Sequence, residues 1–151
     1  MDVAVAVAFV SRPETTAAVT RGAARLLTAL GYAPLVEVTL PNGRRADLMA
    51  LGPKGEILII EVKSGVEDFR TDLKWPEYRP YCDAFAFAVT SEFPRDILPM
   101  EPGLIVADGF GGAILREAAV VRLAGARRKA LTLAFARLAA LRAGGAAATL
   151  L

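Results

Sequence analysis

Three charged residues, Asp47, Glu61 and Lys63, occupy positions that suit metal-dependent phosphodiester chemistry. Residues 45–51 and 56–62 have the aliphatic composition of two strands, joined by a turn rich in glycine and proline. Because side chains alternate along a strand, Glu61 and Lys63 share one face, with Asp47 on the neighbouring strand. Two carboxylates on adjacent strands can bind a hard divalent cation, and a lysine beside them can stabilise charge on a phosphate.

Two further groups could complete this metal site. The main-chain carbonyl of Val62 lies between the two charged side chains and could be a third protein ligand. The position of Glu37 depends on the hairpin that precedes Asp47. A two-residue Asn-Gly loop at 42–43 pairs Val38 with Asp47 and directs Glu37 away from the site, and this is the arrangement that we expect. A loop one residue longer would place Glu37 opposite Asp47.

The composition excludes several other kinds of chemistry. The chain of 151 residues contains no histidine, which removes Ser-His-Asp and Cys-His catalysis and histidine-bound zinc. Its single cysteine, Cys82, excludes an internal disulfide framework and suits a reducing cytoplasm. No stretch reaches the roughly 20 apolar residues of a membrane span, so we expect no membrane partner. The formal net charge of +2 is too small to indicate a partner.

The order of the expected elements indicates an α/β fold, with one mixed β-sheet flanked by α-helices. We expect a single domain over residues 1–151, with residues 1–10 as an N-terminal arm and residues 144–151 as a frayed C-terminus. Pro76 and Pro80 should break the chain after the second helix. The expected helices are 11–30, 67–75 and 123–142, with a helical turn at 94–98, and the expected strands are 35–40, 45–51, 56–62, 82–90, 103–108 and 113–117.

Asp47, a short hairpin and then Glu61-Val62-Lys63 match the D…(D/E)xK pattern of the PD-(D/E)XK nucleases, and the sequence resembles this superfamily. Ala46 stands where the superfamily pattern has proline, at a position that varies within the group. The resemblance implies a restriction-endonuclease-like core, with Asp47, Glu61 and Lys63 as catalytic residues. It also implies Mg²⁺ or Mn²⁺ as the cofactor.

A narrower resemblance extends over most of the chain. The segments that carry it are TRGAARLL, GRRADLMAL, GEILIIEVKSGVEDFRTDLKWPEYRPYCD, GLIVAD and RLAGARRKALTLAFARLA. They are similar to segments of the MmcB-type bacterial DNA repair proteins, which belong to the same nuclease superfamily. The resemblance implies a role in DNA repair with DNA as the partner. Other repair proteins as partners stay open, and the apolar excess of the sequence is compatible with a homodimer.

Several basic and aromatic residues could bind the DNA backbone. Two arginines flank the hairpin turn, and three basic residues begin the last helix. A lysine and a tyrosine follow the strand that ends at Lys63, where related nucleases often place a polar residue and a tyrosine on a helix. A solvated helix face and a packed tyrosine are the alternative interpretations. The candidates are Arg44, Arg45, Lys74, Tyr78, Arg127, Arg128 and Lys129. Arg21 and Arg25, four residues apart, share the polar face of the first helix.

These observations predict a cytoplasmic, metal-dependent DNA endonuclease that acts in DNA repair. Two other functions stay open. One is a nuclease-like domain that binds DNA or a repair partner without cleavage, and the other is an interaction domain whose charged strand ends are structural. A cation held between Asp47 and Glu61 would disfavour the interaction domain, whereas Glu61 paired only with Lys63, in the absence of a cleft, would favour it.

Overall fold

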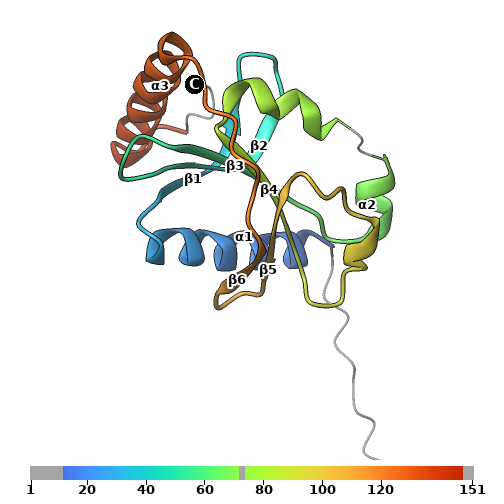
Figure 1. Ribbon diagram of the computed structural model, residues 1–151. Helices are drawn as coiled ribbons and strands as arrows, with labels where there is room; N and C mark the ends of the chain where they lie inside the picture. Colours follow the sequence, from blue (N-terminus) through green and yellow to red (C-terminus); the bar gives the residue numbers. More distant parts are fainter. Residues whose placement is uncertain (1–11, 72–73, 148–151) are drawn as a thin grey trace, which may run out of the picture.

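The computed structural model describes residues 12–71 and 74–147, which form one mixed sheet of six strands with helices on both faces (Figure 1). The strands lie in the order β1-β2-β3-β4-β5-β6. Neighbouring strands are antiparallel, except for the parallel pairs β3–β4 and β4–β5. The predicted α/β fold with one mixed sheet is therefore confirmed. The predicted N-terminal arm lies outside the described residues, as do residues 148–151.

The helices and strands follow the expected order along the chain. The helices are α1 (Arg12–Ala29), α2 (Val66–Thr71) and α3 (Gly125–Ala143), with the 3₁₀ helices η1 (Trp75–Tyr81) and η2 (Arg95–Ile97). The strands are β1 (Ala33–Thr39), β2 (Arg45–Leu51), β3 (Ile57–Val62), β4 (Ala84–Val89), β5 (Gly103–Ala107) and β6 (Gly112–Arg116). Within residues 12–71 and 74–147, no helix has the length and apolar character needed to cross a membrane.

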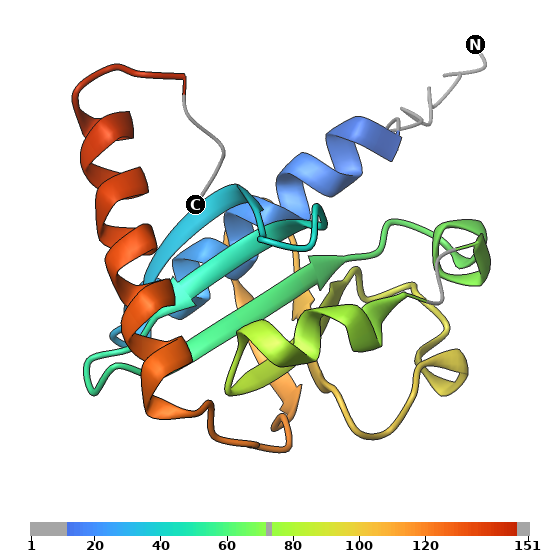
Figure 2. The same cartoon turned by 90° about the horizontal axis from the view of Figure 1, so that it is seen from above.

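Both faces of the sheet are covered, which explains why the central strands are almost continuously aliphatic. Figure 1 shows α1 below the sheet and α3 and η1 above it, and Figure 2 views the sheet from the side of α3 and η1. The α1-side core comprises Val19, Ala23, Leu27, Leu48, Ala50, Ile60, Val62, Ala86, Ala88, Ile105 and Ala107. The α3-side core is centred on Met49, Ile57, Ile59, Phe85, Phe87, Leu131, Phe135 and Leu138.

The segment after α2 differs from the prediction. Helix α2 ends at Thr71, and Trp75–Tyr81 forms a 3₁₀ helix although it contains Pro76 and Pro80. A proline fits the first turn of a helix, because the N–H that it lacks would have no partner there. Trp75 and Tyr78 also stack on Phe85, with ring centroids 5.7 Å and 5.5 Å away. Packing on the α3-side core therefore keeps this segment helical.

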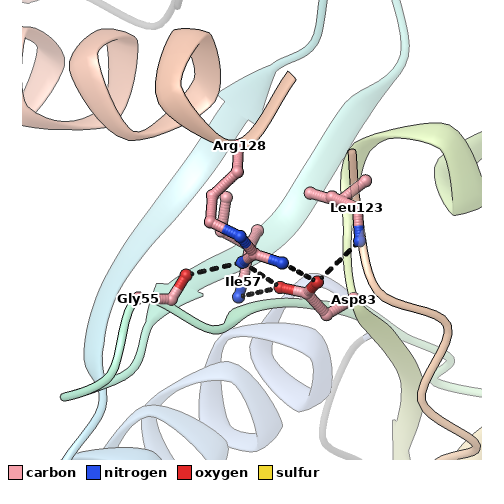
Figure 3. A network of polar contacts seen from close by, with 5 residues as sticks. All are labelled: Gly55, Ile57, Asp83, Leu123 and Arg128. Carbon is pink, nitrogen blue, oxygen red and sulfur yellow. Dashed lines mark hydrogen bonds and ion pairs between the residues drawn. The ribbon is translucent and has the colours of Figure 1, made fainter. Parts of the chain in front are cut away.

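Asp83, just before β4, joins three separate parts of the chain (Figure 3). Its carboxylate accepts hydrogen bonds from the main-chain N–H groups of Ile57 at 2.8 Å and Leu123 at 2.9 Å. Arg128 of α3 forms a two-pronged ion pair with the same carboxylate and also donates to the carbonyl of Gly55. These contacts attach α3 and the segment preceding it to the beginning of β3.

The hydrogen bonds decide the ionisation of Asp83. Burial on its own would raise the pKa of this carboxyl, but the donors from Arg128 and the two main-chain N–H groups outweigh it and lower the pKa to about 2. The folded-state pKa lies below the unfolded value of about 3.9. Asp83 therefore contributes stability that is fully present above that value and is lost as the pH falls toward 2.

We predict that Arg128→Ala lowers the free energy of unfolding by about 3 kcal/mol, because it leaves the buried Asp83 carboxylate without its charged partner. Urea unfolding followed by circular dichroism measures this loss. Lys129→Ala, at the next and exposed position of α3, is the matched control and should change stability by less than about 0.5 kcal/mol. Equal stability of the two variants would contradict the anchoring role of the ion pair.

Helix α1 is positioned by a close backbone contact at Gly22. A Cβ atom at this position would lie 1.8 Å from the carbonyl oxygen of Asp108 and 2.5 Å from that of Gly111. Both oxygens belong to the turn between β5 and β6, where the Asp108 side chain accepts hydrogen bonds from the N–H groups of Phe110 and Gly111. The turn is therefore braced by its own aspartate, and only glycine lets α1 approach it this closely.

Gly22→Ala should lower the free energy of unfolding by about 1–3 kcal/mol or more, which is the usual cost of overpacking, because α1 must move away from the turn. A thermal or urea unfolding curve measures the change. Gly125→Ala is the control, since a Cβ atom at the first position of α3 would meet no atom within 4 Å. If Gly22→Ala were as stable as Gly125→Ala, the contact between α1 and the turn would not constrain the fold.

Candidate functional site

Asp47 and Glu61 lie opposite each other where the ladder between β2 and β3 ends. The last ladder pair is Leu48 with Ile60, and beyond it the side chains replace the main-chain hydrogen bonds. The N–H of Asp47 donates to Oε1 of Glu61 at 3.1 Å, and the N–H of Val62 donates to Oδ2 of Asp47 at 2.8 Å. Each carboxylate is thus oriented by the main chain of the opposite strand, and the two are held side by side.

Lys63 completes the cluster at the carboxyl end of β3. Its main-chain N–H continues the pairing with β4 by donating to the carbonyl of Ala88 at 3.0 Å. Its Nζ lies 3.9 Å from Oδ1 of Asp68, whose other oxygen accepts a hydrogen bond from the N–H of Ser64. The side chain of Lys63 is 4% exposed, so the start of α2 fixes an ammonium group at the base of the site.

The charges of this cluster are only partly balanced. Burial is the main cause that raises the pKa of Asp47, and Asp68 adds to the rise. The N–H of Val62, the ammonium of Lys63 and a hydrogen bond with Glu61 act in the opposite direction without cancelling it. The net rise means that burial makes the ionised form of Asp47 costly, so a cation bound here would favour that form.

The hairpin before Asp47 differs from the expected two-residue loop, and that prediction is wrong. The N–H of Leu40 donates to the carbonyl of Arg44 at 2.7 Å, which closes a loop of three residues, 41–43. Gly43 takes the positive φ of 84° at the third position, as in a hairpin with a glycine bulge. The longer loop shifts the register of β1 by one residue.

The shifted register places Glu37 opposite Asp47, because Val36 pairs with Leu48 and Val38 pairs with Ala46. The chain is irregular there, since Glu37 has a φ of +50°. Glu37 lines the same cavity as the carboxylate pair. Within residues 12–71 and 74–147, however, no three acidic or cysteine side chains come close enough together to hold one metal ion.

Alternation along β2 is also interrupted at Asp47. Ala46 packs in the α3-side core, whereas Leu48, two residues later, packs in the α1-side core. In a regular strand these two side chains would share a face. Asp47 therefore stands where the regular alternation of β2 is interrupted, between a residue of one core and a residue of the other.

A cavity of about 690 Å³ lies over the cluster. Its floor is formed by Asp47, Glu61, Val62 and Lys63, and its sides by residues of α1, β1 and the start of α2. The wall residues are Pro13, Thr16, Ala17, Thr20, Arg21, Val36, Glu37, Ser64 and Asp68. The predicted catalytic residues thus come together in one cleft, and the carbonyl of Val62 belongs to a residue of the same floor.

None of the predicted DNA-binding side chains lines this cleft. Arg44 forms an ion pair with Glu77, and the buried Tyr78 donates to the carbonyl of Arg45 while it packs on the α3-side core. Arg45 and Lys74 are exposed. For Tyr78 the geometry favours the alternative interpretation of a packed tyrosine.

The basic cluster of α3 lies at the opposite end of β3. Arg128 contacts Gly55, just before β3, whereas Glu61 lies four residues after Ile57, the first residue of β3, or about 13 Å along the strand at 3.3 Å per residue. Arg127 lies over the ring of Tyr81 and donates to the carbonyl of Pro80, and Lys129 is exposed. These contacts favour structural roles for Arg127 and Arg128.

Two residues that line the cleft, Arg21 and Asp68, had no role predicted from the sequence. The signal for Asp68 was its place five residues after Lys63, at the start of a helix that must turn back toward the site. The signal for Arg21 was its helical spacing from Thr16, Ala17 and Thr20, which puts these residues on one face of α1.

The fold and the cleft define an α/β protein with Glu61 and Lys63 at the carboxyl end of the central strand β3 and Asp47 beside them on β2. The model of the family described as DNA repair protein MmcB-like matches residues 4–149, and the chain belongs to this family. Among solved structures, the SPO1766 protein of unknown function from Silicibacter pomeroyi is 45% identical and superposes with a TM-score of 0.82. The match covers 85% of this chain and 88% of that chain. The search of curated proteins finds no match.

We predict that Tyr78→Phe leaves DNA affinity unchanged and lowers stability by about 1 kcal/mol, because the substitution removes only the hydrogen bond to the carbonyl of Arg45. Fluorescence anisotropy with labelled DNA and urea unfolding measure the two quantities. A tenfold loss of DNA affinity at unchanged stability would instead give Tyr78 a role at the nucleic acid.

Proposed function

We propose that the protein is a metal-dependent nuclease of the PD-(D/E)XK type that hydrolyses DNA in repair. The observation that carries the proposal is the reciprocal arrangement of Asp47 and Glu61. Each carboxylate is fixed by a main-chain N–H of the opposite strand, and both face a cleft with Lys63 at its base. Membership of a DNA repair family supports DNA as the substrate.

The donors of this site fit a hard divalent cation. They are carboxylate oxygens, joined by the carbonyl of Val62, and Mg²⁺ and Mn²⁺ prefer such oxygen ligands. Two carboxylates bring enough charge for one divalent ion while leaving coordination positions for water and a phosphate oxygen. When bound, the ion would lower the pKa of a water ligand and offset negative charge on the phosphate.

The protein residues would have separate roles in hydrolysis. Asp47 and Glu61 would orient the ion, since their own orientation is set by the strands. Lys63 would donate to the attacking water or to a phosphate oxygen, because its ammonium lies on the same face of β3 as Glu61. Asp68 would keep that ammonium in place.

A second function is favoured by one observation. A nuclease-like domain that binds DNA or a repair partner without cleavage needs no complete metal site, and within residues 12–71 and 74–147 no group of three acidic or cysteine side chains could hold a metal ion. This alternative predicts DNA binding in the absence of hydrolysis.

The test is cleavage of a panel of duplex, single-stranded, flap, mismatched and crosslinked DNAs with Mg²⁺ or Mn²⁺. The wild type should cut at least one substrate, and a chelator should stop it. Glu61→Gln and Lys63→Met should each lower the rate by about 100-fold or more, because the first removes a charged ligand of the ion and the second removes a positive charge that acts on the reacting phosphate. Glu92→Gln, an exposed position after β4, is the control and should retain the wild-type rate.

Calorimetric titration with Mn²⁺ provides a readout that is independent of cleavage. Wild type should bind the ion and Glu61→Gln should not, while circular dichroism shows that both are folded. DNA binding without cleavage on any substrate would support the non-catalytic domain. Cleavage that survives both substitutions would exclude this cleft as the active site.

A further inference from the structure

One face of α1 forms a wall of the cleft. Pro13, Thr16, Ala17, Thr20 and Arg21 line the cavity, at spacings of three and four residues that place them along a single stripe of the helix. The close contact at Gly22 sets the distance between this stripe and the sheet. These residues of α1 therefore form a wall of the cleft that also contains the carboxylates.

Arg21 supplies the positive charge of that wall. Among the described residues it has no hydrogen-bond or ion-pair partner, whereas Arg25, one turn further along α1, donates to the carbonyl of Phe110. An added Cβ atom at Gly109 would lie 3.3 Å from Nη2 of Arg21, so the glycine leaves room for the guanidinium. Arg21 thus has a defined place at the cleft and spare donors.

Thr20 of the stripe is a poorer partner for an anion than Arg21 is, because its hydroxyl proton is already donated within α1. The hydroxyl of Thr20 donates its proton to the carbonyl of Thr16 at 2.7 Å, so toward the cleft it presents only acceptor lone pairs. A phosphate oxygen approaching α1 would therefore find its charged donor at Arg21.

The charge balance of the cleft shows why this donor matters. Four carboxylates line the cavity, Glu37, Asp47, Glu61 and Asp68, against two cations, Lys63 and Arg21. The formal excess of two negative charges repels a phosphate, and one divalent cation would remove it. Lys63 is already close to Asp68, which leaves Arg21 as the lining cation that no described carboxylate engages.

We propose that Arg21 binds a backbone phosphate of the nucleic acid, next to the one at the metal site, so that α1 forms one side of the nucleic-acid channel. The guanidinium presents several donors in a planar fork that matches phosphate oxygens. This inference rests on the proposed function, because it assumes that a polynucleotide enters the cleft.

The test is DNA binding by wild type, Arg21→Ala and Arg21→Lys, measured by fluorescence anisotropy with labelled duplex and single-stranded DNA over a series of salt concentrations. Arg21→Ala should weaken binding several-fold at low salt. It should also reduce the slope of log affinity against log salt by about 0.7–0.9, the value for one phosphate contact. Arg21→Lys should restore most of the slope, because it keeps the charge.

Arg25→Ala is the matched control, with the same residue type removed from the same helix outside the cleft, and it should keep the wild-type slope. Circular dichroism and thermal unfolding confirm that each variant is folded. If wild type binds DNA and Arg21→Ala has the same affinity and slope, the role of Arg21 is excluded while the proposed function stands. If wild type neither binds nor cuts any DNA, the proposed function fails and the inference falls with it.

Discussion

The buried carboxylate of Asp83 is the contact on which the arrangement of the sheet and α3 depends. Two main-chain N–H groups and the guanidinium of Arg128 satisfy it, and its pKa falls to about 2 as a result. The other end of β3 presents the opposite case. There burial raises the pKa of Asp47 and Asp68 adds to the rise, although the N–H of Val62, Lys63 and a hydrogen bond with Glu61 act against it. The hydrogen bonds at one end of the strand favour the ionised carboxyl, whereas burial at the other end disfavours it.

This contrast within a single sheet argues that the charges at the cleft serve function. A protein selected for stability alone would favour the ionised form of its buried acids, as it does for Asp83, or replace them with apolar residues. Buried carboxyl groups with a perturbed pKa occur where chemistry needs them, and they therefore mark candidate active sites. Membership of the MmcB-like family and the similarity to the 45% identical SPO1766 protein show that other proteins share this fold.

Local patterns in the sequence predicted the strands, and with them the cluster of Asp47, Glu61 and Lys63, because the period of two fixes which side chains share a face. The register of β1 was not predictable in the same way. An Asn-Gly pair fits both a two-residue loop and a three-residue loop with glycine last, and the structure adopts the second. The role of Arg128 was also hidden, since its partner Asp83 lies 45 residues away in the sequence. Contacts of that kind depend on the completed fold.

The irregularity at Glu37 has a consequence for how the sheet meets other chains. Successive carbonyls of a regular strand point to opposite sides. The guanidinium of Arg142 nevertheless donates to the carbonyls of both Val36 and Glu37, because the φ of +50° at Glu37 turns the chain there. An exposed edge strand is a template for pairing with another polypeptide, and bends and occupied acceptors make it a poor one. The last turn of α3 thereby covers acceptors on the β1 edge, the border of the sheet nearest the cleft, and makes this edge a poor site for strand addition and aggregation.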